Sequence, residues 1–530
     1  MINEVVSLTL LIALLISVAL DAVHRTSIAI GIAFAGVVIG SILPETRDVP
    51  GKGLPYFGPG TALGAVNFQT LVFLVFMGVF MAIMQRSGAF DWVTKTLVLK
   101  SRMQPGILFV RILLLSYAIS LFVNNVTVVF IMVPITLNIC RQFGVNPVPF
   151  SVAQVAAINL GGASTMVGDF PNIIIATSQK PIELTFLDFQ TNMFPACFAL
   201  LVAEILLFSR MHPEYFTRFE PGPAARAFAA DLAERRSTAI TDKRLLQVSV
   251  LVLAAMLGAF VVSTTLRIPI ALIPVAGAGS ILMIYEVRLR SRHPLDATLD
   301  KLQRRNIIGD EISKVLSEVH WDVVLFLAAL FVVVGSLEHT DVLTWAANFI
   351  LGTSQGNPVL AVILIVVLAS IITMGAEAGP ATAVLIPVIN QLTVAGLGSG
   401  GLLYWAQSLG VQAGSSTTMI GANEGPLAAR MIEQDARIHN ASDRLTAKGF
   451  TRIGARMWLL FIPLSIVYLT GLIFFGWMVS GAAFVLALVG SLWIAARGLG
   501  GGGGPGPAPS VASSQRGPTA PPASPSRRTR

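Results

Sequence analysis

The chain has 530 residues, 54% of them hydrophobic and only 12% charged, and its mean hydropathy is +0.75. Because soluble globular proteins carry about 25% charged residues, this composition excludes a soluble fold and indicates an integral, multi-pass membrane protein. The formal net charge of +8 resides in short segments between apolar stretches. That distribution favours positively charged cytoplasmic loops over a nucleic-acid partner.

A membrane-spanning helix needs about 20 apolar residues. The full-length candidates are 4–22, 26–43, 68–86, 189–209, 245–264, 268–286, 321–338, 456–478 and 480–497. Small polar residues interrupt two further stretches, 150–178 and 402–430, which predicts broken transmembrane helices. Two others, 107–140 and 358–393, are too long for one helix and too short for two spans, which predicts re-entrant hairpins. We therefore expect an all-α polytopic membrane protein with about 11 crossings.

The loop charges support this count. If the hairpins make no net crossing and the N-terminus lies outside, the loops at 87–106, 210–244, 287–320 and 431–455 all fall in the cytoplasm. These four loops are rich in Lys and Arg. The loops assigned outside contain Arg47, Lys52, Lys180 and Arg267. The asymmetry predicts an outside N-terminus and a cytoplasmic C-terminus in a bacterial inner membrane.

The two halves of the chain resemble each other when one is shifted by 253 residues. Under this shift, the matched pairs include Phe73 with Phe326, Trp92 with Trp345, and Pro134 with Pro387. The string Ser164-Thr165-Met166-Val167-Gly168 likewise meets Thr417-Thr418-Met419-Ile420-Gly421. Shared residues of these kinds in one register indicate an internal repeat. An odd number of crossings separates equivalent spans, so the repeats should be inverted, as in secondary transporters.

This organisation predicts five regions. We expect a first inverted repeat at 1–209, a cytoplasmic linker at 210–244 and a second inverted repeat at 245–478. Residues 479–497 add a C-terminal transmembrane helix. The Gly-, Pro- and Ser-rich segment 498–530 is typical of a disordered cytoplasmic tail.

The polar interruptions predict the binding site. Irregular backbone survives at membrane depth only around a cavity, where half-helix N-termini favour anions and exposed oxygens suit Na⁺. The candidate residues are Asn124, Asn125 and Thr127 at the first hairpin tip, Ser164, Thr165, Gly168, Asp169 and Asn172 in the first broken helix, Glu377 at the second tip, and Thr417, Thr418, Asn423 and Glu424 in the second broken helix.

The acids among these residues carry the strongest functional signal. An intramembrane carboxylate is costly and marks function by default, which applies to Asp169, Glu377 and Glu424. The alternative for Asp169 and Glu424 is a solvated cavity edge or a helix cap. Glu204, alone in a full span, is either a structural hydrogen-bond partner or a proton carrier.

At these motifs the chain resembles the ion transporter superfamily. The nearest branch holds ArsB-type arsenite permeases, the P protein, citrate permeases (CitMHS) and NhaD-type antiporters, and is related to divalent anion:sodium symporters. The segment from Asn124-Asn125-Val126-Thr127 to Pro134 resembles that branch's D-N-V-T hairpin, and Gly168-Asp169-Phe170-Pro171-Asn172 resembles its G-D-P-P-N loop. The resemblance implies an elevator-type mechanism and a homodimer. It also implies coordinating roles for Asn125, Thr127, Ser164, Thr165, Thr417 and Thr418, with Na⁺ at Asn125, Ser164 and Thr165.

The chain departs from this pattern at both tips. Asn124 stands where the branch has Asp, and Glu377-Ala378-Gly379-Pro380 stands where it has D-N-I-P. Gly425 replaces the Asn expected in the second loop. We therefore hypothesise that a proton on Glu377 replaces Na⁺ at the second tip.

These features predict a secondary transporter and not an enzyme, since no nucleophile–base pair, zinc motif or phosphate loop is recognisable. The favoured hypothesis is an ion-coupled permease for a small inorganic or organic anion in the lipid bilayer. The alternative is a Na⁺/H⁺ antiporter of NhaD type. The coupling ion is Na⁺ or H⁺, with no other cofactor. No arginine adjoins a predicted break, so backbone dipoles and hydroxyls would bind the anion.

Overall fold

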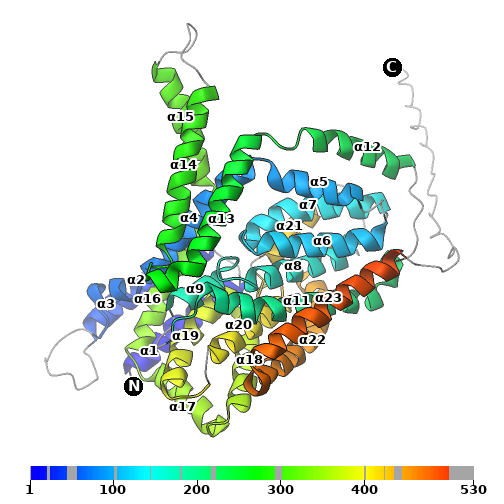
Figure 1. Ribbon diagram of the computed structural model, residues 1–530. Helices are drawn as coiled ribbons and strands as arrows, with labels where there is room; N and C mark the ends of the chain where they lie inside the picture. Colours follow the sequence, from blue (N-terminus) through cyan, green and yellow to red (C-terminus); the bar gives the residue numbers. More distant parts are fainter. Residues whose placement is uncertain are drawn as a thin grey trace, which may run out of the picture.

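The computed structural model describes residues 2–20, 24–43, 56–100, 104–143, 145–178, 182–216, 223–292, 301–398, 401–422, 424–434 and 444–499. Every regular element in these ranges is helical, with no β-strand (Figure 1). Eight described helices are long and apolar enough to cross a membrane. The predicted all-α multi-pass fold is confirmed, while the number of crossings stays a prediction. Residues 500–530, most of the predicted tail, lie outside the described ranges.

Eleven α-helices lie in the described part of the first half of the chain. They are α1 (Ile2–Leu20), α2 (Arg25–Ile42), α3 (Pro59–Ala65), α4 (Phe68–Arg86), α5 (Ala89–Lys100), α6 (Pro105–Ser120), α7 (Asn125–Phe143), α8 (Pro147–Ala163), α9 (Phe170–Ser178), α10 (Phe186–Asp188) and α11 (Phe194–Met211). The π-helical turn η1 (Phe189–Met193) joins α10 to α11, so that these three form one candidate span.

The second half follows a helical linker. The linker consists of η2 (Pro213–Phe216) and α12 (Pro223–Ser237). The helices after it are α13 (Lys243–Leu266), α14 (Leu272–Arg292), α15 (Lys301–Ser317), α16 (Trp321–Glu338), α17 (Val342–Ser354), α18 (Pro358–Ala376), α19 (Ala378–Val394), α20 (Leu402–Ser415), α21 (Gly425–Gln434), α22 (Ala447–Phe475) and α23 (Trp477–Leu499).

Helix boundaries repeat with the same offset as the sequence. Each of α4, α5, α6 and α7 begins 253 residues before its counterpart among α16, α17, α18 and α19. Pro105 and Pro358 both occupy the first turn of a helix, where a missing N–H costs least. Pro134 and Pro387 both lie inside the helix that follows. The opposite orientation of the halves stays a prediction.

The predicted hairpins and broken helices correspond to four structural features. Residues 121–124 join α6 to α7, and the single residue Glu377 joins α18 to α19. Residues 164–169 separate α8 from α9, and residues 416–424 separate α20 from α21. The first segment of each interrupted helix packs along the first helix of the hairpin in the same half: α8 packs on α6, and α20 packs on α18. How deeply the hairpins enter the bilayer stays a prediction.

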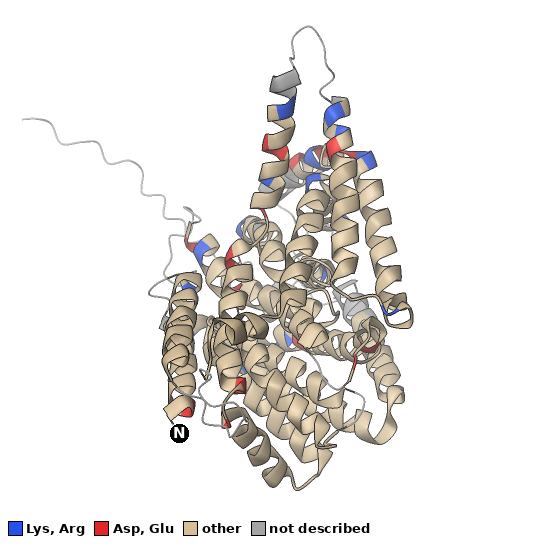
Figure 2. Cartoon of the chain, turned by 90° about the vertical axis from the view of Figure 1, so that its left-hand side faces the viewer, with Lys and Arg blue, Asp and Glu red and all other residues tan. Residues whose placement is uncertain are grey.

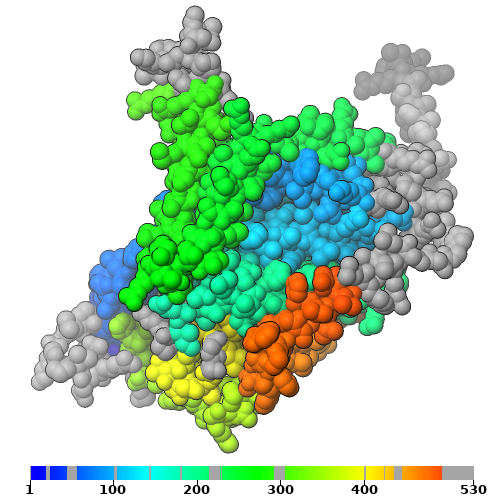
Figure 3. Space-filling model, in the orientation of Figure 1, coloured from blue at the N-terminus to red at the C-terminus, as the bar shows by residue number. Residues whose placement is uncertain are grey.

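The two halves exchange their flanking helices. The N-terminal helix α2 packs against α16 of the second half, whereas α14 packs against α4 of the first (Figure 1). In the space-filling view, α13 and α14 (green) cover one side of the first-half helices (blue to cyan), and the second-half helices (yellow) lie below (Figure 3). A residue of α2 can therefore reach the polar motifs of the second half.

The outer surface exposes apolar side chains on its outer helices and charged side chains at one end of the molecule. Leu251, Leu459, Val467 and Trp477 are among the large apolar side chains that the outer helices expose, as lipid contact requires. Charged residues gather near the end of the molecule formed by α14 and α15 (Figure 2). The segments expected to be basic loops instead contain the helices α5, α12 and α15. Ion pairs one turn apart, such as Asp231–Arg235 in α12, support helix formation there.

Glycines allow each interrupted helix to lie directly on its hairpin. A Cβ at Gly161 would lie 2.4 Å from the carbonyl oxygen of Tyr117, and a Cβ at Gly414 would lie 2.4 Å from that of Ser370. These positions are equivalent under the 253-residue shift. No larger residue fits at either contact without moving backbone.

We predict that Gly414→Ala destabilises the protein by about 1–3 kcal/mol, because its methyl group would overlap the α18 backbone. The measurement is unfolding of the purified protein in mixed micelles. Gly258→Ala in α13 is the matched control, since a Cβ there meets no atom within 4 Å. Equal destabilisation by both changes would contradict the proposed helix contact.

Candidate functional site

The first hairpin tip carries two of the predicted residues at the start of α7. The side-chain oxygen of Asn124 accepts a hydrogen bond from the backbone N–H of Val126 at 3.0 Å, which caps the helix. One turn later, the Thr127 hydroxyl lies 3.3 Å from Nε2 of His320, directly before α16. His320 is a site residue that the sequence motifs did not reveal, because it lies 193 residues away in the chain.

The first break is fastened to this tip by side-chain hydroxyls. Thr165 donates to the carbonyl oxygen of Leu121 at 2.5 Å and accepts from the N–H of Gly168 at 3.1 Å. Ser164 donates to the carbonyl oxygen of Leu160 and lies 2.7 Å from the hydroxyl of Tyr117. These bonds supply partners for backbone groups that the interruption of the helix leaves unpaired.

The second break reproduces these bonds at equivalent positions. Thr418 donates to the carbonyl oxygen of Met374 at 2.7 Å and accepts from the N–H of Gly421 at 2.9 Å. Thr417 donates to the carbonyl oxygen of Ala413 at 2.7 Å. The sequence string shared by the two breaks therefore joins each interrupted helix to its hairpin by hydrogen bonds. The sequence alone did not distinguish this structural role from ion binding.

Asn172 fastens the first break to the second half. Its Nδ2 donates to the carbonyl oxygens of Ala163 and Thr165 at 2.7 and 2.8 Å. Its Oδ1 accepts from the Ser408 hydroxyl of α20 at 2.8 Å. Gly168 lies close by, where a Cβ would approach the Ser120 carbonyl oxygen to 2.6 Å. Both residues therefore fix the shape of the break.

A buried polar chain crosses between the halves. Ser120 donates to Oδ1 of Asn125 at 2.5 Å, and Nδ2 of Asn125 donates to Oδ1 of Asn159 at 3.3 Å. Asn159 in turn donates to the Ser415 hydroxyl at 3.3 Å. All four side chains are buried. The oxygens predicted to hold Na⁺ on Asn125, Ser164 and Thr165 thus already have protein partners, and the Na⁺ site stays a prediction.

Two buried acids, one from each break, lie within electrostatic reach of each other. Asp169 is 5% exposed and Glu424 is 3% exposed, and their charges interact. Asp169 accepts from the N–H of Phe170 at 2.8 Å, which caps α9. Two buried acids near each other disfavour the doubly charged form, which a proton or a bound cation would relieve. The cap expected as an alternative for Asp169 is therefore present, together with an arrangement suited to a cation.

Gln412 was not anticipated from the sequence but lies beside this acid pair. It is equivalent to Asn159 under the 253-residue shift, and its amide lies close to Asp169. Neither amide atom has a hydrogen-bond partner in good geometry among the described residues, and the same holds for the Ser416 hydroxyl. Both side chains are 1% exposed. Buried polar atoms without partners are costly, so this position suits a bound ion or water.

The second tip holds an ion pair. Nη1 of Arg25 lies 3.1 and 2.9 Å from the two carboxyl oxygens of Glu377, and Nη2 lies 3.5 Å from Oδ2 of Asp322. The guanidinium also stands 5.6 Å from the ring centroid of Phe326. The expectation that no arginine adjoins a break is wrong, because the exchange of α2 between halves brings a distant residue to the tip.

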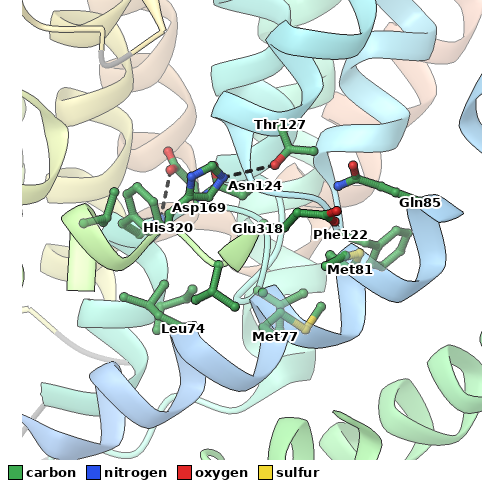
Figure 4. Close-up of a pocket in the computed structure, with 18 of the residues that line it drawn as sticks. Leu74, Met77, Met81, Gln85, Phe122, Asn124, Thr127, Asp169, Glu318 and His320 are labelled. Carbon is green, nitrogen blue, oxygen red and sulfur yellow. Dashed lines mark hydrogen bonds between the residues drawn. The ribbon is translucent and has the colours of Figure 1, made fainter. Parts of the chain in front are cut away.

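A cavity of 260 Å³ lies at the first tip (Figure 4). Its polar lining consists of Gln85, Asn124, Thr127, Asp169, Glu318 and His320. Apolar residues of α4 and α16, such as Met77 and Val323, complete the wall. No Lys or Arg lines it within the described chain, so acids dominate its charge. Glu318 pairs with Arg86 at 2.6 Å at the end of α4.

Two candidates remain apart from this arrangement. Asn423 lies outside the described residues. Glu204 in α11 is fully buried, and neither carboxyl oxygen has a hydrogen-bond partner among the described residues. Among the described residues, Glu204 therefore does not act as a structural hydrogen-bond partner, which was the first of the two alternatives for it.

Comparisons with known proteins connect this geometry with transport. A model of the family CitMHS, described as citrate transporter, matches residues 11–410 and 311–506. Magnetosome protein MamN of Paramagnetospirillum magneticum is 29% identical over 424 residues, which cover 79% of this chain and 90% of MamN. Uncharacterized transporter Mb2703 of Mycobacterium bovis is 28% identical over 88% of this chain and 98% of its own.

A solved structure shares the fold. MtrF of Neisseria gonorrhoeae, described as illuminating a class of antimetabolite efflux pumps, has a TM-score of 0.51 at 13% identity, covering 83% of this chain and 94% of that one. At this identity the likeness concerns the fold alone. It agrees with an all-helical membrane transporter architecture.

We predict that Thr165→Val destabilises the first break by about 1–3 kcal/mol, because it leaves the Leu121 carbonyl and the Gly168 N–H without their partner. Thr165→Ser keeps the hydroxyl and should retain most of the stability. Unfolding in mixed micelles checks both. Thr191→Val, in an exposed turn, is the control and should change the free energy of unfolding by less than about 0.5 kcal/mol. A Ser variant as unstable as the Val variant would point to the methyl group instead.

Proposed function

Because the chain belongs to the citrate transporter (CitMHS) family of membrane transporters, we propose that it is an ion-coupled secondary transporter for a small anion. The observation that supports this most is the burial of two acids, Asp169 and Glu424, one from each interrupted helix. A paired-break site of this kind suits alternating access, in which one site is exposed to each side in turn.

The volume of the cavity limits the size of the solute. Its 260 Å³ falls below the roughly 300–1,000 Å³ of pockets for drug-sized ligands. An inorganic anion or a small carboxylate therefore fits better than a larger metabolite. The hydroxyl and amide groups of Thr127 and Asn124 offer donors at the tip.

Charge at the site explains why an anion would need a coupling ion. Asp169 and Glu318 line the cavity, whereas no Lys or Arg does so in the described chain. Glu318 is already paired with Arg86, so an anion entering beside Asp169 is repelled unless a proton or a cation neutralises that carboxylate. Binding of H⁺ or Na⁺ at the Asp169–Glu424 pair, beside the Gln412 amide, would supply that neutralisation.

The surface charge suggests the direction of access. Gln85 and Glu318 line the cavity, and Arg86 pairs with both Glu318 and Glu311 of α15. Charged residues gather near the end of the molecule formed by α14 and α15 (Figure 2). Basic helices at this end favour the cytoplasmic side. We therefore place the N-terminus outside and the C-terminus inside a bacterial inner membrane, with the cavity open to the cytoplasm and an elevator-type movement exposing it to the other face.

A Na⁺/H⁺ antiporter is the second candidate. The acidic, arginine-free lining of the cavity suits a cation at least as well as an anion. In this reading the Asp169–Glu424 pair would exchange Na⁺ for H⁺ without any anion.

Transport in proteoliposomes separates the two candidates. We expect uptake of a small carboxylate or inorganic anion that depends on an imposed pH or Na⁺ gradient, because the site is acidic until a cation enters. Citrate and phosphate are the first solutes to test. Na⁺-driven proton efflux in the complete absence of these anions would instead establish the antiporter.

We predict that Asp169→Asn and Glu424→Gln each lower coupled transport by about tenfold or more, equivalent to about 1.4 kcal/mol in the barrier, because the coupling cation loses a ligand. Initial rates in proteoliposomes measure this. Glu286→Gln, an exposed acid paired with Arg290 in α14, is the control and should keep the parent rate. Full coupling in both site variants would exclude the acid pair as the coupling site.

A further inference from the structure

The two hairpin tips differ in what stands against them, although they are equivalent in the chain. Asn124 and Glu377 occupy equivalent positions under the 253-residue shift. Asn124 faces the cavity. Glu377 instead faces the guanidinium of Arg25, at 2.9 Å at the closest. A side chain of the protein thus occupies the place at the second tip that a cavity occupies at the first.

Arg25 reaches this position from outside the repeated motifs. It is the first residue of α2, and Thr26 beside it donates to the carbonyl oxygen of Asp322 at 3.0 Å. That bond anchors the start of α2 on α16. The anchored guanidinium contacts Glu377, Asp322 and the face of Phe326, a set of contacts that fixes its orientation.

The backbone of Glu377 has an unusual conformation beside this contact. With φ of 64° and ψ of 161°, Glu377 lies in a region that is almost restricted to glycine. It is also the only residue between α18 and α19. A strained conformation persists only where its surroundings stabilise it. The ion pair with Arg25 and the hydrogen bond from the Ala381 N–H to the Glu377 carbonyl oxygen are two of the contacts that do so.

Electrostatics gives the ion pair a second role. The charged and titratable groups around Glu377 include Arg25 on α2, Asp322 on α16 and Glu424 in the second break, with His320 beyond Asp322 and Asp169 beyond Glu424. The Glu377 side chain is 14% exposed. Without Arg25, a carboxylate in this acidic surrounding would need a proton or a diffusible cation.

We propose that the Arg25 guanidinium acts as a tethered cation, that is, a positive charge fixed to the protein that takes the place of a diffusible cation at the second tip. Coupling ions would then bind and leave only at the first tip and at the Asp169–Glu424 pair. The inference rests on the proposed ion coupling. It replaces the hypothesis that a proton on Glu377 takes the place of Na⁺, because the arginine already neutralises that carboxylate. Arg25 is thus a positioning residue that decides how many free cations accompany the solute.

Chemical rescue tests the tethered cation. In proteoliposomes, Arg25→Gln should transport at least about tenfold more slowly at neutral pH, because the Glu377 carboxylate loses the guanidinium that faces it. Low-millimolar guanidinium, or acidification that protonates Glu377, should restore part of the rate. The double variant Arg25→Gln/Glu377→Gln should transport without added guanidinium, and acidification should no longer be needed to restore its rate. Arg25→Lys keeps a charge and should show an intermediate rate.

A matched control and a solute-free readout complete the test. Arg288→Gln removes another half-buried ion pair, with Asp242, and should not make transport dependent on guanidinium. If the parent transports none of the solutes tested, the thermal midpoint still decides the question: guanidinium should raise it in Arg25→Gln and not in Arg25→Gln/Glu377→Gln. Equal responses of these two variants, or no response in the single variant, would overturn the proposal.

Discussion

The structure depends on providing hydrogen-bond partners for the backbone of two helices that stop halfway. In a membrane protein, an unpaired N–H or C=O costs several kcal/mol, so an interrupted helix must be covered from all sides. Each break obtains that cover from its own hairpin, through Thr165 on Leu121 and Thr418 on Met374. Glycines at 161 and 414 bring the helices close enough for these bonds to form.

The exchange of flanking helices joins the halves into one unit. With α2 on α16 and α14 on α4, neither half is complete without helices from the other. The buried chain from Asn125 through Asn159 to Ser415 crosses the same boundary. A movement that exposes the site to the other side must therefore carry elements of both halves, which is consistent with the proposed alternating access.

The distribution of charge inside the molecule connects architecture with coupling. Acids come from both breaks and from the second tip, whereas Arg25 is the guanidinium that meets them there. An excess of buried carboxylates is stable only if cations or protons balance it. In the proposed mechanism, a transporter uses this imbalance, because the empty site attracts a cation and the occupied site then tolerates an anion.

The sequence by itself determined the elements and the motifs. Apolar stretches of fixed length predicted the helices, and the 253-residue offset predicted where the hairpins and breaks begin, because helix starts and polar interruptions are local properties of the chain. It also selected Asp169 and Glu424, since a carboxylate inside an apolar segment is conspicuous wherever the chain folds.

Only the tertiary structure decided what meets these residues. His320, Gln412 and above all Arg25 are unremarkable in sequence, because Arg25 begins an ordinary apolar helix and lies 352 residues from Glu377. Their roles arise from the exchange of α2 and the packing of α16, which are long-range events without a local pattern. The hydroxyls of Ser164 and Thr418 show the converse: the sequence singled them out for ion binding, and packing gives them backbone partners first.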